Sequence, residues 1–443
     1  MKKTFYIVNL GCSKNQVDGE TILALMEQKG WTYTELEDAH VVIINTCGFI
    51  NDAKQESIQA ILSCKSTYPD KIVIAAGCLS ERYGEELAQE MIEADGFIGN
   101  RDIYAVPNAV EKIAKKGTRL VHPSSPSKDR FVKRNVLFNF PRSVYVKIAE
   151  GCNNNCTYCA IPIIRGGLRS VPLDIILKEV EDFVKKDFFE INLVSQDLAS
   201  WGTDIGLDLK DLLKGICAIK GDFRIRLLYM HPDKFDSSIL ALFKEDKRLV
   251  PYFDIPFQHA SEKILASMGR KGSKDKYLKL IQTIRTELPE AVIRSTIMVG
   301  FPGEKDDDFQ CLMEFLEGAE LDWCGFFTYS KEEGTKAASF KGRVTIANAK
   351  QRKEQAQELQ SRITEKRLDG FVGKEIEVLV EELIKEEDIA LGRGYMNAPE
   401  VDGAIILHSD RVGQGKIKSG DVVKARVVKR NNMDLEAADV GLS

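Results

Sequence analysis

Residues 151–162 read GCNNNCTYCAIP and place Cys152, Cys156 and Cys159 in a C-x3-C-x2-C loop. A four-iron cluster normally takes four cysteines, so three thiolates leave one iron open to bind something else. Zinc would need a fourth protein ligand, and neither a nearby histidine nor a second C-x2-C pair provides one. The spacing therefore indicates an iron–sulfur centre that activates a small molecule at iron.

This loop directly follows the first of six β-like runs that alternate with helical patterns. The runs are 144–149, 190–196, 224–230, 252–258, 292–300 and 324–330. Helical patterns fill most of the intervals, for instance at 172–186 and 261–269. Six βα units fit a partial barrel, which stays open where a full barrel of eight units would close. Barrel enzymes work at the carboxyl ends of their strands, so the triad occupies the expected place of an active site.

Three further cysteines each follow a short apolar run near the start of the chain. Cys12 ends YIVNLGC, Cys47 ends VVIINTC and Cys78 ends IVIAAGC. The expected elements are strands at 4–10, 41–45 and 72–76 and helices near 17–29 and 51–66. Such alternation predicts a parallel sheet whose strand ends share one edge, so these cysteines can form a second triad. The alternative is three buried structural cysteines, a residue type often found inside proteins.

Composition shifts divide the chain into four parts. The segment HPSSPSKDRFVKRN (122–135) is rich in Pro, Ser and charge, which is typical of a linker. A long polar helix is expected at about 346–369, and short alternating strands follow it: EIEVLVEE, GAIILH and DVVKARVVKR. The predicted fold class is α/β, with an N-terminal parallel-sheet domain (1–120), a linker (121–140), a partial (β/α)6 barrel (141–369) and a small antiparallel β-barrel (370–443).

Composition and charge limit the class of protein. The chain has 443 residues, 44% of them hydrophobic, and a net charge of −5. This balance argues against a protein that binds nucleic acid with its whole surface, because Lys and Arg neutralise the phosphates.

No apolar stretch reaches the roughly 18 residues of a membrane span. The start MKKTFYIVNLGC mimics a lipoprotein signal but runs straight into an expected SKNQVD turn. Cysteines grouped at metal-ligand spacing are typical of a reducing compartment, so we expect a cytoplasmic protein without membrane attachment.

In its context, the compact triad resembles that of the radical S-adenosylmethionine superfamily. The resemblance implies a [4Fe–4S] cluster whose open iron binds S-adenosylmethionine by its amino and carboxylate groups. An electron from the cluster then cleaves the sulfonium and yields a 5′-deoxyadenosyl radical, while the protein binds and orients the reactants. Tyr158 matches the aromatic position near the adenine. Contacts to the methionyl and ribose groups are expected at Gln196, Asp197, Gln258 and the GFPGE segment from Gly300; ordinary loop residues and turn glycines are the alternative.

The order of a three-cysteine domain, a radical domain and a small barrel resembles the methylthiotransferases along essentially the whole chain. The resemblance implies that Cys12, Cys47 and Cys78 hold a second, auxiliary [4Fe–4S] cluster whose open iron carries the sulfur. It also implies that a C–H bond becomes C–S–CH3. One S-adenosylmethionine supplies the methyl group and another supplies the radical, with an external electron donor and sulfur source.

Two branches of this family differ in substrate: one modifies an adenosine in tRNA (MiaB-like), and the other an aspartate of a small-subunit ribosomal protein. Four segments resemble the ribosomal branch, the RimO enzymes: AEGCNNNCTYCAIPIIRGGLRS, YMHPDKF, PYFDIPFQHAS and NAPEVDG. Val171 departs from that pattern, in which arginine usually continues the LRS run. The resemblance implies attack at the aspartate β-carbon, giving 3-methylthioaspartate. The C–H bond there is too weakly acidic for an ordinary enzymic base, which is a reason to use a radical.

The charge of the chain from Phe371 onward bears on the same choice. It contains ten Lys and Arg against 14 Asp and Glu, a net charge of −4. A barrel that grips tRNA should be basic, whereas an acidic one suits a basic ribosomal protein, so tRNA is not the expected partner. A merely solvated acidic surface is the alternative.

A third hypothesis is an iron–sulfur scaffold or electron-transfer protein without catalysis of its own. A barrel with an open cluster iron argues against it, because electron carriers protect a cluster whose irons are all ligated.

The remaining candidates each have a simpler explanation beside the functional one. Arginine suits bidentate recognition of a carboxylate, and the candidates for the substrate are Arg165, Arg169, Arg224, Arg226 and Arg294. The sequence does not choose among them, and the simpler explanation is that most are structural or contact the cofactor. His231 and His259 end the third and fourth barrel strands, where a catalytic or a structural histidine fits. The loop EEGTKA (332–337) either caps the active site or is a surface turn. Cysteines without partners at ligand spacing are expected to be small core residues: Cys64, Cys217, Cys311 and Cys324.

Overall fold

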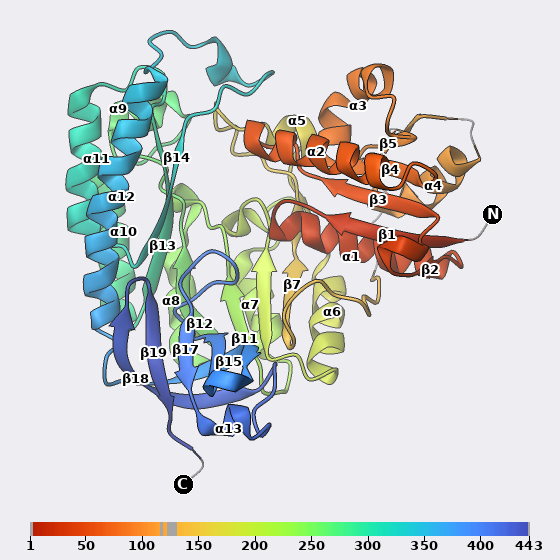
Figure 1. Ribbon diagram of the computed structural model, residues 1–443. Coiled ribbons are helices and arrows are strands. Elements are labelled where there is room, and N and C mark those ends of the chain that lie inside the picture. Colours follow the sequence, from red (N-terminus) through yellow and green to blue (C-terminus); the bar gives the residue numbers. More distant parts are fainter. Residues whose placement is uncertain (1–2, 116–117, 122–130, 442–443) are drawn as a thin grey trace.

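Three packed bodies follow one another along the chain (Figure 1). The computed structural model describes residues 3–115, 118–121 and 131–441. An N-terminal sheet lies beside a central open barrel, and a small C-terminal β-barrel lies at the lower end of the central one (Figure 1). The predicted linker at 121–140 falls partly on 122–130, outside the described residues.

The N-terminal sheet has six parallel strands in the order β2-β1-β3-β4-β5-β6. They are β1 (Thr4–Asn9), β2 (Thr32–Tyr33), β3 (Val41–Thr46), β4 (Ile72–Gly77), β5 (Gly96–Ile98) and β6 (Leu120–Val121). The helices are α1 (Ser13–Gln28), α2 (Asn51–Thr67), α3 (Cys78–Glu90) and α4 (Val106–Ala114). β3 is buried along its whole length, because helices cover both faces of the sheet. Its unbroken apolar run follows from that position, since a central parallel strand has no solvent-facing side.

The strands and helices predicted in this domain are confirmed, but the expected SKNQVD turn is wrong. These residues form the first turns of α1, which begins at Ser13. Most of their polar side chains are buried, and Asp18 pairs with Lys147 of the central barrel. Farther along the helix, Glu20 pairs with Arg134. Polar residues suggested a turn because the sequence does not show which charges of the next domain neutralise them.

The central barrel is an open sheet of six parallel strands in the order β14-β13-β12-β11-β10-β7, which confirms the predicted partial barrel. The strands are β7 (Ser143–Lys147), β10 (Glu190–Val194), β11 (Arg224–Leu227), β12 (Leu249–Asp254), β13 (Val292–Val299) and β14 (Trp323–Thr328). The helices are α5 (Ile161–Arg165), α6 (Leu173–Lys185), α7 (Leu209–Cys217), α8 (Leu240–Glu245), α9 (Glu262–Ser267), α10 (Lys274–Glu287), α11 (Asp306–Ala319) and α12 (Ile346–Asp369). A short antiparallel pair, β8 (Ala149–Glu150) and β9 (Arg169–Ser170), frames the loop of the compact triad.

The C-terminal domain is a closed barrel of five strands in the cyclic order β15-β16-β17-β19-β18. The strands are β15 (Glu375–Ile384), β16 (Ile389–Arg393), β17 (Ile405–His408), β18 (Val422–Asn431) and β19 (Asp434–Asp439), with α13 (Asp410–Gly413) between β17 and β18. Neighbouring strands are antiparallel except β17 and β19, which pair in parallel. The predicted small barrel is therefore confirmed, with β16 and β19 added to the three expected strands.

One loop of the C-terminal domain, residues 394–403 between β16 and β17, enters the open central barrel. Trp323 donates a hydrogen bond to the carbonyl of Met396 at 2.7 Å, and Tyr252 donates to Asp402 at 2.5 Å. Met396 is fully buried in a core cluster that includes residues of both domains. The C-terminal barrel is thus joined to the central one by a shared core.

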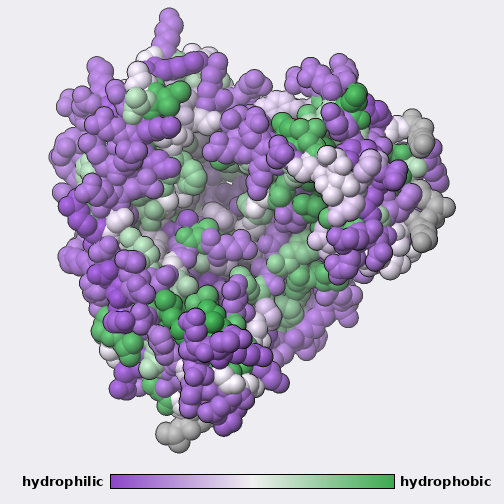
Figure 2. Space-filling model, in the orientation of Figure 1, coloured by the Kyte–Doolittle hydropathy of each residue, from purple (hydrophilic) through white to green (hydrophobic). Residues whose placement is uncertain are grey.

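The outer surface of the molecule is mostly hydrophilic, with a hollow between the three bodies on the face shown in Figure 2. Among the described residues, no helix combines the length and apolar character that crossing a membrane requires. The six cysteines of interest lie around the carboxyl ends of the N-terminal and central strands.

Candidate active site

The three N-terminal cysteines lie on adjacent loops at one edge of the N-terminal sheet. Cys12 is the N-cap of α1, Cys47 directly follows β3, and Cys78 is the first residue of α3. β3 pairs in parallel with both β1 and β4, so the carboxyl ends of the three strands lie side by side. Cys12 is exposed, whereas Cys47 and Cys78 are buried. A group held by all three would be shielded on one side and reachable on the other.

Glycines beside these cysteines let the three loops pack directly on one another. A Cβ on Gly11 would lie 2.8 Å from the Cβ of Cys47. A Cβ on Gly48 would lie 3.0 Å from the carbonyl carbon of Cys78, and one on Gly77 would lie 2.7 Å from the carbonyl oxygen that precedes Cys47. Real Cβ atoms do not approach so closely, so each loop needs a glycine where it meets the next. The structure therefore brings the dispersed triad together.

Two side chains donate hydrogen bonds to the sulfur of Cys78. Asn100 Nδ2 lies 3.3 Å from the Sγ, and Arg165 Nη2, from the central domain, lies 3.2 Å from it. Burial raises the pKa of the Cys78 thiol, and Arg165 opposes that rise. Burial also raises the pKa of Cys47, to about 11. Iron deprotonates a coordinating thiol outright, and the donors at Cys78 suit the thiolate that results.

The three thiols of the dispersed triad are compatible with an iron–sulfur cluster. Among the described residues, no three His, Cys, Asp or Glu side chains come close enough to hold one metal ion. A four-iron cluster is wider than an ion, so its cysteine ligands stand farther apart. Three thiols on converging loops, without a fourth protein ligand, match such a cluster with one open iron.

The compact triad lies on the loop after β8, at the carboxyl end of the first barrel strand. Gly151 starts this loop with a φ of 69° and no room for a side chain, since a Cβ would lie 2.0 Å from the carbonyl oxygen of Gly167. Backbone N–H groups donate to two of the sulfurs, from Asn154 to Cys152 at 3.5 Å and from Ile161 to Cys159 at 3.4 Å. These donors favour thiolates and help to shape the cluster site.

Tyr158 is held in the mouth of the barrel. Its hydroxyl accepts a hydrogen bond from Arg270 Nε at 3.3 Å, and Arg270 also donates to the carbonyl of Pro256 at 2.8 Å. The Tyr158 ring meets Phe301 edge to face, with 6.5 Å between ring centroids. The tyrosine is half-buried beside the strand ends, which is compatible with the predicted adenine contact.

Gln196 and Asp197 follow β10 but differ in what they offer a ligand. Asp197 accepts hydrogen bonds from Asn154 Nδ2 at 2.8 Å, from Ser200 Oγ at 2.5 Å and from the backbone N–H of His231 at 3.0 Å. Its carboxylate is thereby occupied in holding the compact-triad loop. Gln196 donates to Glu150 at 3.2 Å, and its own buried Oε1 has no partner. Gln196 is thus the better candidate for a ligand contact.

Gln258 and Gly300 shape the ends of β12 and β13 through the backbone. Gln258 has a φ of 71°, accepts from the N–H of Met298 at 2.7 Å and donates its own N–H to Thr296 at 2.8 Å. Gly300 has a φ of 74°, and its N–H donates to Glu304 Oε2 at 2.7 Å. Gly300 is therefore required for a turn, and a direct contact to S-adenosylmethionine stays a prediction for both residues.

Several buried polar atoms near the strand ends lack a partner among the described residues. His259 Nδ1 accepts from the N–H of Ser261 at 3.0 Å, while Nε2 has no hydrogen bond and lies 3.6 Å from Glu304. The Tyr329 hydroxyl is also unpaired. Together with Gln196 Oε1, these atoms fit a polar ligand that completes their hydrogen bonding. Tyr329 was missed from the sequence, although it lies in the last predicted run, 324–330.

His231 has a structural role. Its Nδ1 accepts from the N–H of Asp233 at 3.2 Å, which starts a short turn after β11. Burial and the nearby Arg270 lower the pKa of His231 to about 4, so the ring is neutral at pH 7.

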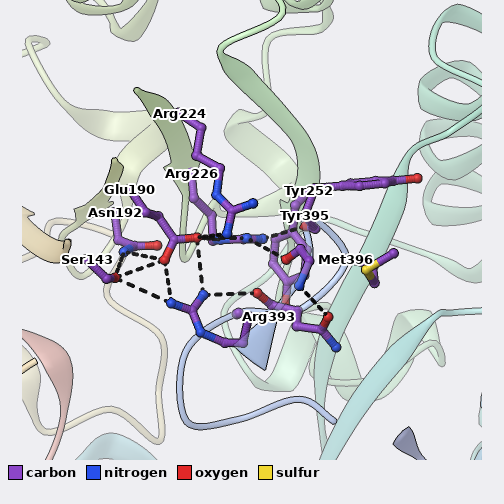
Figure 3. Close-up of polar contacts among 12 residues, drawn as sticks. Ser143, Glu190, Asn192, Arg224, Arg226, Tyr252, Arg393, Tyr395 and Met396 are labelled. Atoms are coloured by element: carbon purple, nitrogen blue, oxygen red, sulfur yellow. Dashed lines mark hydrogen bonds and ion pairs between the residues drawn. The ribbon is translucent and has the colours of Figure 1, made fainter. Parts of the chain in front are cut away.

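Most of the candidate arginines are already neutralised by carboxylates. Arg224 and Arg226 of β11 pair with buried Glu190, the first residue of β10, at 3.1 and 3.0 Å (Figure 3). Arg294 pairs with Asp254 at 3.2 Å and with Asp402 at 3.3 Å. These three arginines are therefore structural. Arg165 lies beside the dispersed triad instead, and Arg169 lies in β9.

The loop 332–337 connects the central barrel to the N-terminal domain. Glu332 is buried and pairs with Lys54 of α2 at 3.2 Å and with Arg82 of α3 at 2.8 Å. A Cβ on Gly334 would lie 3.0 Å from Ile163, in the helix after the compact triad. The N–H of Ala337 donates to the carbonyl of residue 157, inside the triad loop, at 2.9 Å. The loop therefore lies over the region between the two triads, as a cap would.

Three family comparisons match the three bodies in order. Residues 4–99 match the Uncharacterized protein family UPF0004, residues 146–316 the Radical SAM superfamily, and residues 372–440 the TRAM domain. Among solved structures, the radical S-adenosylmethionine methyltransferase TsrM from Kitasatospora setae is similar, with a TM-score of 0.57 and 12% identity over 74% of this chain and 75% of that one. That likeness shows a shared fold over the covered part of the chain.

Curated relatives match the chain from end to end. A ribosomal protein uS12 methylthiotransferase RimO from Treponema denticola is 45% identical over 97% of this chain and 99% of the relative. Relatives with the same name from Thermodesulfovibrio yellowstonii and Thermotoga maritima are 39% and 41% identical, covering 99% and 96% of this chain and 100% and 97% of their own lengths. With the two cysteine triads and the three-part fold, this similarity shows that the chain belongs to the RimO family of radical S-adenosylmethionine methylthiotransferases.

Proposed function

We propose that this methylthiotransferase acts on an aspartate of ribosomal protein uS12. It would convert a C–H bond at the β-carbon to C–S–CH3 and give 3-methylthioaspartate. The observation that carries the proposal is end-to-end similarity to relatives named for uS12, in a chain that keeps two complete cysteine triads. Transfer to a tRNA adenosine, the other branch considered, is not favoured by these relatives.

The radical S-adenosylmethionine family implies one [4Fe–4S] cluster and S-adenosylmethionine. We assign the cluster to Cys152, Cys156 and Cys159, and a second, auxiliary cluster to Cys12, Cys47 and Cys78. The convergence of the three N-terminal loops supports the second assignment. When bound, these groups supply the one-electron cleavage of S-adenosylmethionine and the sulfur that is transferred.

The chain's own side chains have binding and shielding roles in this scheme. We assign Gln196 Oε1 and His259 Nε2, which have no hydrogen-bond partner among the described residues, to contacts with S-adenosylmethionine, and Tyr158 to contact with its adenine. Asp197 positions the compact-triad loop through Asn154. The loop 332–337 excludes water from the space between the triads, where a reactive radical must meet only its substrate.

Each predicted domain has its own role in this scheme. Residues 1–120 would hold the auxiliary cluster, 141–369 would perform the radical chemistry, and 370–443 would recognise the substrate. The C-terminal barrel carries a net charge of −4 from Phe371 onward, which complements a basic ribosomal protein and disfavours tRNA. An external electron donor and sulfur source complete the reaction, and a reducing cytoplasm suits a chain whose ten cysteines are all free.

A competition experiment tests the substrate. Anaerobically reconstituted full-length enzyme would receive S-adenosylmethionine, reductant and a sulfur source, with a uS12 peptide and unmodified tRNA present together. Mass spectrometry should locate the methylthio group on the peptide aspartate and none on tRNA. The Cys156→Ala variant should give neither product and no cleavage of S-adenosylmethionine. A methylthio group on adenosine would refute the proposed substrate, although the radical chemistry would stand.

A further inference from the structure

Arg165 links the two cysteine triads by direct contacts. It is the last residue of α5, the helix that follows Cys159, and its side chain is only 3% exposed. Figure 1 shows α5 beside α3, the helix that begins with Cys78. Across this boundary, Arg165 Nη2 donates to the Sγ of Cys78 at 3.2 Å. A residue of the radical domain thus contacts a sulfur of the auxiliary triad.

Two carboxylates hold the other arm of Arg165. Its Nη1 pairs with Asp18 Oδ2 at 2.8 Å and with Glu150 Oε1 at 2.7 Å. Lys147 pairs with the same two acids, at 2.6 Å from Glu150. Two acids and two cations therefore form a buried group in which the charges balance. The planar guanidinium is fixed by one arm, and the other arm donates to the Cys78 sulfur and, at 3.4 Å, to Asn15 Oδ1.

This geometry goes beyond what anchoring the domain boundary requires. Lys147 already joins the central barrel to Asp18 of α1 without touching a cysteine. Arg165 adds the contact to Cys78, whose sulfur also accepts from Asn100. Hydrogen bonds to the sulfurs and local net charge are among the factors that set the potential of an iron–sulfur cluster. A cation that donates to a ligand sulfur stabilises the more negative, reduced cluster.

We propose that Arg165 is a positioning residue that raises the reduction potential of the auxiliary cluster through its charge and its N–H···S bond to Cys78. The inference rests on the auxiliary cluster of the proposed function. It makes the redox state of that cluster depend on a side chain that belongs to the radical domain, six residues past the last cysteine of the compact triad.

The test isolates the auxiliary cluster in the full-length chain. Cys152, Cys156 and Cys159 are all changed to Ala, and the chain is reconstituted with iron and sulfide. Electron paramagnetic resonance then follows a redox titration of the remaining cluster, with circular dichroism as the check on folding. Arg165→Met should shift the reduction equilibrium towards the oxidised cluster at least tenfold, about 59 mV for one electron.

Lys147→Met is the matched control, because it removes one positive charge from the same buried group without touching Cys78. It should shift the equilibrium by clearly less than Arg165→Met. Arg165→Lys keeps the positive charge and loses the planar fork of donors, so its reduction potential should lie between those of wild type and Arg165→Met. This variant also tests the inference if the Met variant does not fold.

Equal shifts in the Met variants of Arg165 and Lys147, or no shift in any Arg165 variant, would overturn the role assigned to Arg165. A folded triple-Ala chain that takes up no iron would overturn the auxiliary cluster itself, and the inference with it. Iron content therefore distinguishes failure of the proposed function from failure of the inference.

Discussion

At the scale of single residues, what surrounds each cysteine separates the six proposed ligands from the other four. Cys64 and Cys311 lie in helices, Cys217 ends a helix and Cys324 lies in a strand. All four are partly buried, and burial raises their pKa values. None lies on a loop where two strand ends and a glycine converge. We therefore expect these four to be inert packing residues.

Iron content tests the distinction between the six proposed ligand cysteines and the four packing cysteines. Cys47→Ala should remove about four irons per chain, because the auxiliary cluster loses one of only three protein ligands. Cys64→Ala is the matched control, since it removes a partly buried thiol of the same domain and should leave the iron content unchanged. Iron and sulfide analysis after anaerobic reconstitution measures both. Equal iron in the two variants would contradict the ligand assignment.

At the scale of elements, the loop 332–337 is held against another domain through a buried carboxylate. The Glu332 side chain is only 4% exposed, and it faces two cations from different helices of another domain. Burial disfavours the charge of Glu332, but Ser330, Arg82 and Lys54 outweigh it and lower its pKa. The Glu332 carboxylate thus holds the loop together with two backbone contacts, from Arg82 to the carbonyl of Glu333 and from the N–H of Ala337 to residue 157.

Glu332→Gln should loosen the cap. Arg82 and Lys54 would keep their charges and lose their common partner, and breaking a buried ion pair in this way costs roughly 3–5 kcal/mol. Amide hydrogen exchange across residues 330–337 should become at least tenfold faster. Glu333→Gln makes the same change one position along, on an exposed side chain, and should leave exchange as in wild type. Unchanged exchange in both variants would show that the loop is held otherwise.

At the scale of the whole molecule, a buried charge network joins the base of the barrel to the C-terminal domain (Figure 3). Glu190 pairs with Arg393 of β16 at 2.6 Å as well as with Arg224 and Arg226 of β11. Burial disfavours the charge of Glu190, but the three guanidinium groups outweigh it and hold its pKa well below the usual range. This carboxylate therefore adds a buried ionic contact to the shared core that attaches the C-terminal barrel.

Glu190→Gln should destabilise the protein by roughly 3–5 kcal/mol at pH 7, because Arg224 and Arg226 lose their buried counter-charge and Arg393 keeps only Glu381. The folded-state pKa is depressed, so this stabilisation is complete above the unfolded pKa of about 4.3 and is lost as pH falls towards the folded value. The free energy of unfolding in urea should differ between the variant and wild type at pH 7, and this difference should narrow below about pH 4. Glu181→Gln, in an exposed pair with Lys185, should change stability by about 0.5 kcal/mol or less. A difference that persists at low pH would contradict this explanation.

The sequence by itself determined the order of the three domains, the six-unit barrel and the two cysteine triads. These are local properties: apolar runs alternate with helical periods, and each cysteine is adjacent to the strand or loop that places it. The parallel alternation even predicted that Cys12, Cys47 and Cys78 share an edge, because strand ends of such a sheet must meet there.

Only the tertiary structure decided which polar side chains meet. Gln196 and Asp197 are neighbours in sequence, yet the Asp197 carboxylate accepts hydrogen bonds from the protein, whereas Gln196 Oε1 has no partner. Arg165 reaches a sulfur 87 positions away, and Arg294 pairs with a carboxylate 108 positions away in the inserted loop of the C-terminal barrel. Such pairs arise when whole domains pack, and a contact over that separation leaves no periodic pattern in the chain. That is why the buried charges in α1 suggested a turn, and why the sequence could not choose among the five candidate arginines.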